Sequence, residues 1–339
     1  MGGLLTLPAV AIAAIFFPPA VPLIAASFIL MQTFTNIANG SWFPLLADII
    51  PEKQRGTASG IQGILTMVGA ALGIVLISGL VSAGKIPLAL WVIGIVMAAS
   101  VVVTVLVIRK QDKPAPVEEK RSVWSYFGDM FRVKTRVPVF TWVVVSATLA
   151  NMGLNSLAFF ATYFFQVYFP EQYPNAEAAA AGFQLMGGIS LVFTMIGALV
   201  SGIISDKIGR RPVILVGIFV CAVTTVAMAF SPTFLFFLIM TGIRSLFTGP
   251  ILTVIPALTS DLSPKEETGQ YMGYANLATG VSGALSAIIF GVILTNWTRN
   301  SFFIILVASA FLFLVGALIF MWKVSQKEVD QRIALEKAK

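Results

Sequence analysis

The stretch DIIPEKQRGTASG at residues 48–60 returns later in the chain as DLSPKEETGQYMG at residues 261–273. Its aspartate, its proline and two of its glycines recur with an offset of 213 residues, and a Phe-Thr pair at 34–35 recurs at 247–248 with the same offset. A repeat that keeps the same direction in both halves is typical of two similar helical bundles related by an axis along the membrane normal.

The composition indicates that the bilayer is the solvent of this chain. Apolar residues make up 58% of it and charged residues 11%, against roughly 45–50% and about 25% in soluble domains. The apolar runs are long enough for about ten helices across a hydrocarbon core, and backbone groups in lipid must be satisfied within each segment. We therefore predict an all-α integral membrane protein with four helices in the first half and six in the second. The predicted spans are 2–17, 20–46, 56–81, 86–108, 138–165, 182–203, 213–230, 232–258, 270–295 and 300–322.

Lysine and arginine predict the orientation. Of the 22 basic residues, 19 lie in one alternating set of connections, while the opposite face has only Lys85 and Arg299. Basic loops stay on the cytoplasmic side, so we expect both termini in the cytoplasm and the protein in a bacterial-type inner or plasma membrane. The basic residues behind the net charge of +7 would then fix the orientation in the membrane. We therefore expect no nucleic-acid partner.

The predicted organisation has four parts. Residues 1–108 form a helical bundle, and residues 109–137, which are rich in proline and mixed charge, form a central cytoplasmic connector. Residues 138–323 form a six-helix bundle and residues 324–339 a cytoplasmic tail. Because the repeat offset gives six spans in the second half and only four in the first, we expect two helices of the first bundle to be absent from the N-terminus.

The segment GIISDKIGRRP at residues 202–212 resembles the loop signature of the major facilitator superfamily. That resemblance extends over the whole chain and implies the two-bundle transporter fold of that family, with this chain matching helices 3–12 of twelve. By the resemblance, we expect the loop to work during rocking of the bundles. Gly202 would allow close helix contact and Gly209 a tight turn; the charges of Asp206, Arg210 and Arg211 would pair and separate. The alternative is a basic loop that only fixes topology.

The repeated stretches add three residues to this conformational set, namely Asp48, Arg55 and Asp261. For the two aspartates we favour a simpler role, in which each carboxylate interacts with the dipole of the helix that follows. Antiporters of the family carry a proline in the motif that here reads VGAALG at 68–73. Its absence weighs against drug/proton antiport.

Candidate solute-binding residues follow from the helices that line the central cavity in this family. These helices would here be the runs 20–46, 138–165 and 232–258. On the first two runs, amide and aromatic side chains recur at helical spacing, which suits an uncharged polyhydroxyl solute. These residues are Gln32, Asn36, Asn39, Trp42, Asn151, Asn155 and Tyr163. The alternative is that the amides hydrogen-bond between helices.

Arg244 lies near the middle of the third run and shares a helical face with Thr241 and Thr248. An arginine at that depth costs at least about 2.5–3.5 kcal/mol, so we expect Arg244 and Thr248 to bind solute. Arg244 would hold an anionic group of the solute or pair with a carboxylate on another helix. A structural role, with backbone carbonyls as its partners, is the alternative.

These features predict a secondary active or facilitative transporter of a small polar organic solute, with a sugar-like solute favoured, that works as a monomer. The alternatives are an exporter of amphipathic compounds and a membrane protein that does not transport. We expect no enzyme activity, no metal site and no cofactor, because the chain has no histidine and one cysteine, Cys221. The coupling ion, H⁺ or Na⁺, is left open.

Overall fold

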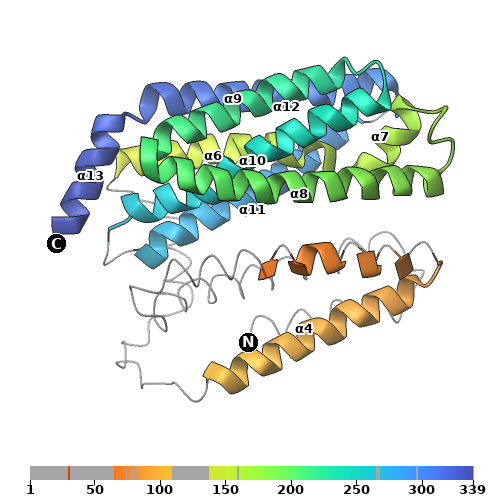
Figure 1. The fold of residues 1–339 in the computed structure, drawn as a ribbon, viewed down its shortest axis with the longest axis horizontal. Helices are drawn as coiled ribbons and strands as arrows, with labels where there is room; N and C mark the ends of the chain where they lie inside the picture. The colour runs from red at the N-terminus through yellow and green to blue at the C-terminus, as the bar shows by residue number, and fades with distance from the viewer. Residues whose placement is uncertain are drawn as a thin grey trace. The chain divides into compact units, whose positions relative to one another are not determined.

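The computed structural model describes residues 83–108, 137–158, 160–264, 268–294 and 297–338, together with Leu30 and the short stretches 65–66, 68–73, 75–77 and 79–80. The chain divides into two compact units, Met1–Lys134 and Thr135–Lys339. Both are all-helical in the part that the structure describes, which confirms the predicted fold class (Figure 1). Residues 109–136 of the predicted connector 109–137 lie outside the described residues.

In the first unit, the clearest element is α4, Ile86–Ile108. A turn precedes it, in which Gly84 has a φ of +71°. Residues other than glycine rarely adopt this backbone conformation. Helical residues between 65 and 80 lead into this turn, and Ala83 N donates to Gly79 O at 3.1 Å. The α4 sequence is apolar on every side, as expected of a helix that crosses a bilayer.

The second unit is a bundle of long helices, followed by a short polar helix at the C-terminal end. Its elements are α6 (Pro138–Ala158), α7 (Ala161–Tyr168), α8 (Ala176–Ile208), α9 (Arg210–Ala229), α10 (Phe234–Leu262), α11 (Thr268–Ile293), α12 (Arg299–Lys323) and α13 (Gln326–Ala338). Among the described residues, α4 and α8 to α12 are long and apolar enough to cross a membrane. This multi-pass pattern confirms an integral membrane protein.

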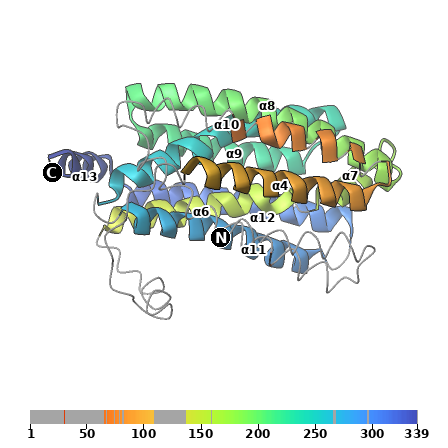
Figure 2. The ribbon, with the colours of Figure 1, turned by 90° about the horizontal axis from the view of Figure 1, so that it is seen from below.

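Helix α10 runs beside both α8 and α9, while α12 packs against α6 and α9 and α11 packs against α6 (Figures 1 and 2). Two core clusters fill the bundle. One is mostly aliphatic, around Ile214, Ile218 and Leu258, and the other is aromatic, around Phe164, Phe237 and Phe302. Large apolar side chains also cover the outer faces of the helices, as expected where lipid replaces water.

Helices α8 and α10 of the described bundle cross with their backbones in close contact. A Cβ added to Gly197 would lie 1.8 Å from Leu246 O, and one added to Gly249 would lie 2.2 Å from the carbonyl carbon of Gly197. Only glycine fits at such a backbone-to-backbone contact. We expected a close approach at Gly202, but a Cβ there would meet no described atom within 4 Å. Among the described residues, the close approach on α8 is at Gly197, five residues before Gly202.

The predicted span 138–165 is two helices, α6 and α7, separated at 159–160. This break was not predicted because neither proline nor glycine stands there. After the break, Phe164, Phe165 and Tyr168 are all buried in the aromatic cluster, where Phe164 lies 5.0 Å from Phe237 between ring centroids. Helix α7 thus contributes three large aromatic side chains to this cluster, and their burial stabilises this end of the bundle.

The predicted tail after residue 323 contains the helix α13 (Figure 1). Val329 on this helix is buried, and Arg332 Nε donates to Leu262 O at the end of α10, at 3.5 Å. Through these contacts, α13 packs against the bundle at the end where α10 and α12 finish.

Candidate functional site

Arg244 is the eleventh residue of the 29-residue helix α10, about 15 Å along the axis from its first residue. Its side chain is partly buried overall, but Nε and Nη1 are inaccessible and have no hydrogen-bond partner among the described residues. The hydroxyl of Thr241, one turn earlier, is buried and also has no partner in the described part of the chain. The structure thus places three unused polar atoms together on one face of α10.

The other groups around Arg244 are already hydrogen-bonded. Thr248 Oγ1 donates to the carbonyl of Arg244 at 3.0 Å, and the buried Cys221 thiol on α9 lies 3.6 Å from the same carbonyl. Cys221 Sγ is also 3.9 Å from Thr248 Oγ1. Thr248, which we predicted to bind solute, therefore ties α10 to α9 in this structure.

The two predicted asparagines of α6 differ in what they bind. Asn151 Nδ2 donates to Ala147 O in its own helix at 2.9 Å. Asn155 is partly exposed, and its amide makes no hydrogen bond with any described residue. Tyr163 is 53% exposed on α7 and lies 4.4 Å from Trp297 between ring centroids. Trp297, which the sequence analysis missed, precedes α12 and is far from Tyr163 in sequence.

At one end of the bundle, the loop signature has formed a set of specific contacts. Arg210 Nε lies 2.8 Å from Asp261 Oδ2. Arg211 Nε donates to Val324 O at 2.5 Å and its Nη2 to Met321 O at 2.8 Å. The arginines thus connect the start of α9 to the ends of α10 and α12.

The glycine and the first aspartate of the signature complete this end. Gly209 has a φ of +91°, so the tight turn between α8 and α9 is at the glycine where the motif predicts it. Asp206 is exposed and pairs with no described residue. Asp261, which we expected to precede a helix, lies instead in the last turn of α10, and α11 begins only at Thr268.

The remaining predicted residues lie outside the described part of the chain. They are Gln32, Asn36, Asn39, Trp42, Asp48 and Arg55. Within the described part, no three histidine, cysteine, aspartate or glutamate side chains come together as a metal site would need.

Among the described residues, apolar helices of spanning length define the class, a polytopic membrane protein. The Major Facilitator Superfamily model matches residues 1–173 and 152–337. The chain belongs to this superfamily, which consists of transporters and not enzymes.

Individual relatives are distant. The chain is 25% identical over 132 residues to the probable transporter AQR1 of Saccharomyces cerevisiae. The aligned residues cover 39% of this chain and 22% of that protein. It is 24% identical over 115 residues to the multidrug transporter AQR1 of Candida glabrata, covering 34% of this chain and 19% of that protein. The chain thus spans about a fifth of the length of these curated relatives.

Among solved structures, a D-xylose-proton symporter matches with a TM-score of 0.67 and 14% identity, over 97% of this chain and 81% of that chain. This similarity shows a shared fold.

Proposed function

We propose that this chain carries a small polar organic solute across a cytoplasmic membrane by alternating access, with rocking of its two bundles and both termini in the cytoplasm. The favoured solute has hydroxyl groups for the amides and an anionic group for Arg244, as a sugar acid does. The single observation that carries this proposal is the set of hydrogen-bonding groups on α6 and α10 that no described residue uses.

Arg244 carries an energetic cost that a bound solute would offset. A cation in mid-membrane costs at least about 2.5–3.5 kcal/mol, and an unpaired buried donor adds to that cost. In the described spans, acidic residues occur only near helix ends, at Glu177, Asp206 and Asp261. An anionic group of a bound solute would supply the missing acceptor and form charge-assisted hydrogen bonds with the guanidinium.

Asn155 supports the same proposal from α6, a helix that packs against α10. Its amide has two donors and an acceptor, and none of them is used within the described structure. Tyr163 and Trp297 offer partly exposed ring faces, on which an apolar face of a sugar ring would stack.

Alternating access requires contacts that hold each bundle rigid and contacts that can change. The Arg210–Asp261 pair and the Arg211 hydrogen bonds join three helices of one bundle. Asp206, exposed and unpaired among the described residues, is available for a partner that changes during the cycle.

A second candidate function, export of amphipathic compounds, is favoured by the multidrug transporter among the relatives. Against it stand Arg244, which has no partner among the described residues, and the absence of proline from residues 68–73. Counterflow distinguishes the two. Proteoliposomes that contain the purified chain would be preloaded in turn with a neutral hexose, a sugar acid or a cationic dye.

We expect only the sugar acid to drive accumulation of its labelled form above protein-free liposomes. Accumulation of the dye alone would favour the exporter, and accumulation of none of the three would contradict both functions.

A further inference from the structure

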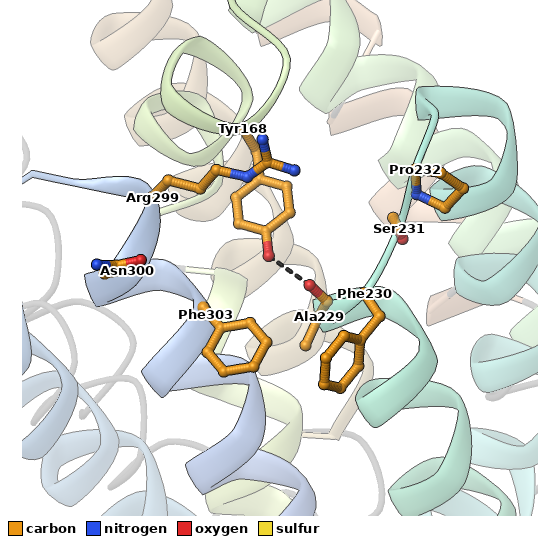
Figure 3. A pocket seen from close by; sticks show the side chains of 8 residues that line it. All are labelled: Tyr168, Ala229, Phe230, Ser231, Pro232, Arg299, Asn300 and Phe303. Carbon is orange, nitrogen blue, oxygen red and sulfur yellow. Dashed lines mark hydrogen bonds between the residues drawn. The ribbon is translucent and has the colours of Figure 1, made fainter.

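A pocket of about 300 Å³ opens at the end of the bundle opposite the Arg210–Asp261 pair (Figure 3). Three segments form it, namely the end of α7, the link from α9 to α10 and the first turn of α12. Its lining residues are Tyr168, Ala229, Phe230, Ser231, Pro232, Arg299, Asn300 and Phe303. None of these residues has a role in the proposed transport site.

One side of the pocket is polar and carries a positive charge. The guanidinium carbon of Arg299 lies 4.9 Å from the centre of the Tyr168 ring, and the Tyr168 hydroxyl donates to Ala229 O at 2.5 Å (Figure 3). Arg299 is exposed, and no described carboxylate lies within 4.0 Å of it. The ring holds the arginine at the pocket while its charge stays without a counter-ion, so an anion fits there.

The other side of the pocket is aromatic and continues into the surface that faces lipid. Phe230 is 66% exposed, and its ring centroid lies 5.1 Å from that of Phe303. Away from the pocket, α9 and α12 pack side by side. Each of these helices has a row of exposed apolar side chains at helical spacing. The rows are Val216, Phe219, Val223 and Val226 on α9, and Ile304, Val307, Phe311 and Leu314 on α12.

A ligand that fits this arrangement is amphipathic, with an anionic head and long apolar chains. The pocket volume of about 300 Å³ is at the lower end of the roughly 300–1,000 Å³ range for ligand pockets, so the head group would lie inside the pocket and the acyl chains outside it. Trp297, 48% exposed just before α12, is typical of a residue at the membrane–water boundary, where lipid phosphates lie.

We propose that the pocket binds the phosphate of an anionic phospholipid through Arg299, with the acyl chains along the exposed rows of α9 and α12. Binding there joins the ends of α7, α9 and α12. It therefore stabilises this end of the bundle whenever the lipid is present.

The test uses the purified whole chain in detergent, with dioleoyl phosphatidylglycerol or dioleoyl phosphatidylcholine added. Native mass spectrometry counts bound lipid, and a thermal melt measures stability. We expect phosphatidylglycerol to bind and to raise the Tm by roughly 2–4 °C. Phosphatidylcholine should do neither.

Three variants assign the effect to the pocket. Arg299→Gln should lose the phosphatidylglycerol adduct and the rise in Tm, and Arg299→Lys, which keeps the charge, should retain a part of both. Lys327→Gln, an exposed change on α13, is the matched control and should behave as the wild type. Phe230→Ser should weaken lipid binding, because it removes the aromatic wall.

Three outcomes would overturn the proposal. Retention of the adduct by Arg299→Gln would show that the anionic head group does not bind at Arg299. Equal binding of the two lipids by the wild type would show that the pocket does not select an anionic head group. An equal rise in Tm with inorganic phosphate alone would assign the pocket to a free anion in place of a lipid.

Discussion

Arg210 Nε and Asp261 Oδ2 lie 2.8 Å apart and join the ends of two helices. Each of the two charges interacts unfavourably with the dipole of its own helix. Arg210 is the first residue of α9, whose N-terminus disfavours a cation, and Asp261 lies in the last turn of α10, whose C-terminus disfavours an anion. Each residue therefore compensates for the other. The side chains are 26% and 32% exposed, so water screens part of the interaction.

This arrangement predicts a non-additive pair of substitutions. Arg210→Gln and Asp261→Asn should each lower the free energy of unfolding by about 0.5–1 kcal/mol, because each leaves one charge at an unfavourable helix end. The double variant should unfold within about 0.5 kcal/mol of the wild type. Thermal melts of the four proteins measure the coupling, and a double variant whose loss equals the sum of the single losses would contradict it.

The glycine contact between α8 and α10 predicts a position-specific effect of alanine. Gly249→Ala should destabilise the bundle by about 1–3 kcal/mol, because its Cβ would overlap the backbone at Gly197. Gly188→Ala on α8 is the control, since its Cβ would meet no described atom within 4 Å, and alanine favours helix by about 0.8–1 kcal/mol. Equal melting temperatures for the two variants would show that this crossing does not hold the bundle together.

The two asparagines of α6 predict different effects on transport. Asn155→Ala should raise the KM for uptake about fivefold, the effect of losing one hydrogen bond of about 1 kcal/mol to the solute, with no change in melting temperature. Asn151→Ala should leave KM unchanged, because the Asn151 amide already bonds to Ala147 O. Kinetics in proteoliposomes check both, and the reverse pattern would move the solute away from Asn155.

Arg211 predicts a local change in protection. Arg211→Gln removes two hydrogen bonds to the last carbonyls of α12, which should cost about 1–3 kcal/mol and free the junction of α12 and α13. Hydrogen exchange of residues 321–330 should then become faster. Lys207→Gln, at the exposed end of α8, is the control and should leave the exchange of residues 321–330 unchanged. Unchanged exchange in Arg211→Gln would show that other contacts hold the junction.

Much of the fold could be predicted because lipid imposes simple rules on sequence. Length and apolarity located most of the described helices, and the mid-membrane position of Arg244 followed from its place in the run. The break at 159–160 was not predictable from the same rules. It occurs together with aromatic packing between residues far apart in sequence, such as Phe164 and Phe302.

The contacts of the loop were only partly predictable. We expected the charges of Asp206, Arg210 and Arg211 to act together, but the partners of the arginines come from other parts of the chain. Asp261 is 51 residues after Arg210 and Val324 is 113 residues after Arg211. Such pairs depend on which helix ends meet, and no local pattern records that. The Arg299 pocket was missed for the same reason.

The measurement that tests the account most directly is uptake of a labelled sugar acid by proteoliposomes that contain either the wild type or Arg244→Gln. The wild type should accumulate the acid above protein-free liposomes. Arg244→Gln should reconstitute to the same level but lose at least about tenfold in uptake, because a charge-assisted hydrogen bond contributes roughly 1.5–3 kcal/mol. Equal uptake by the two proteins would contradict the assignment of Arg244 to the solute.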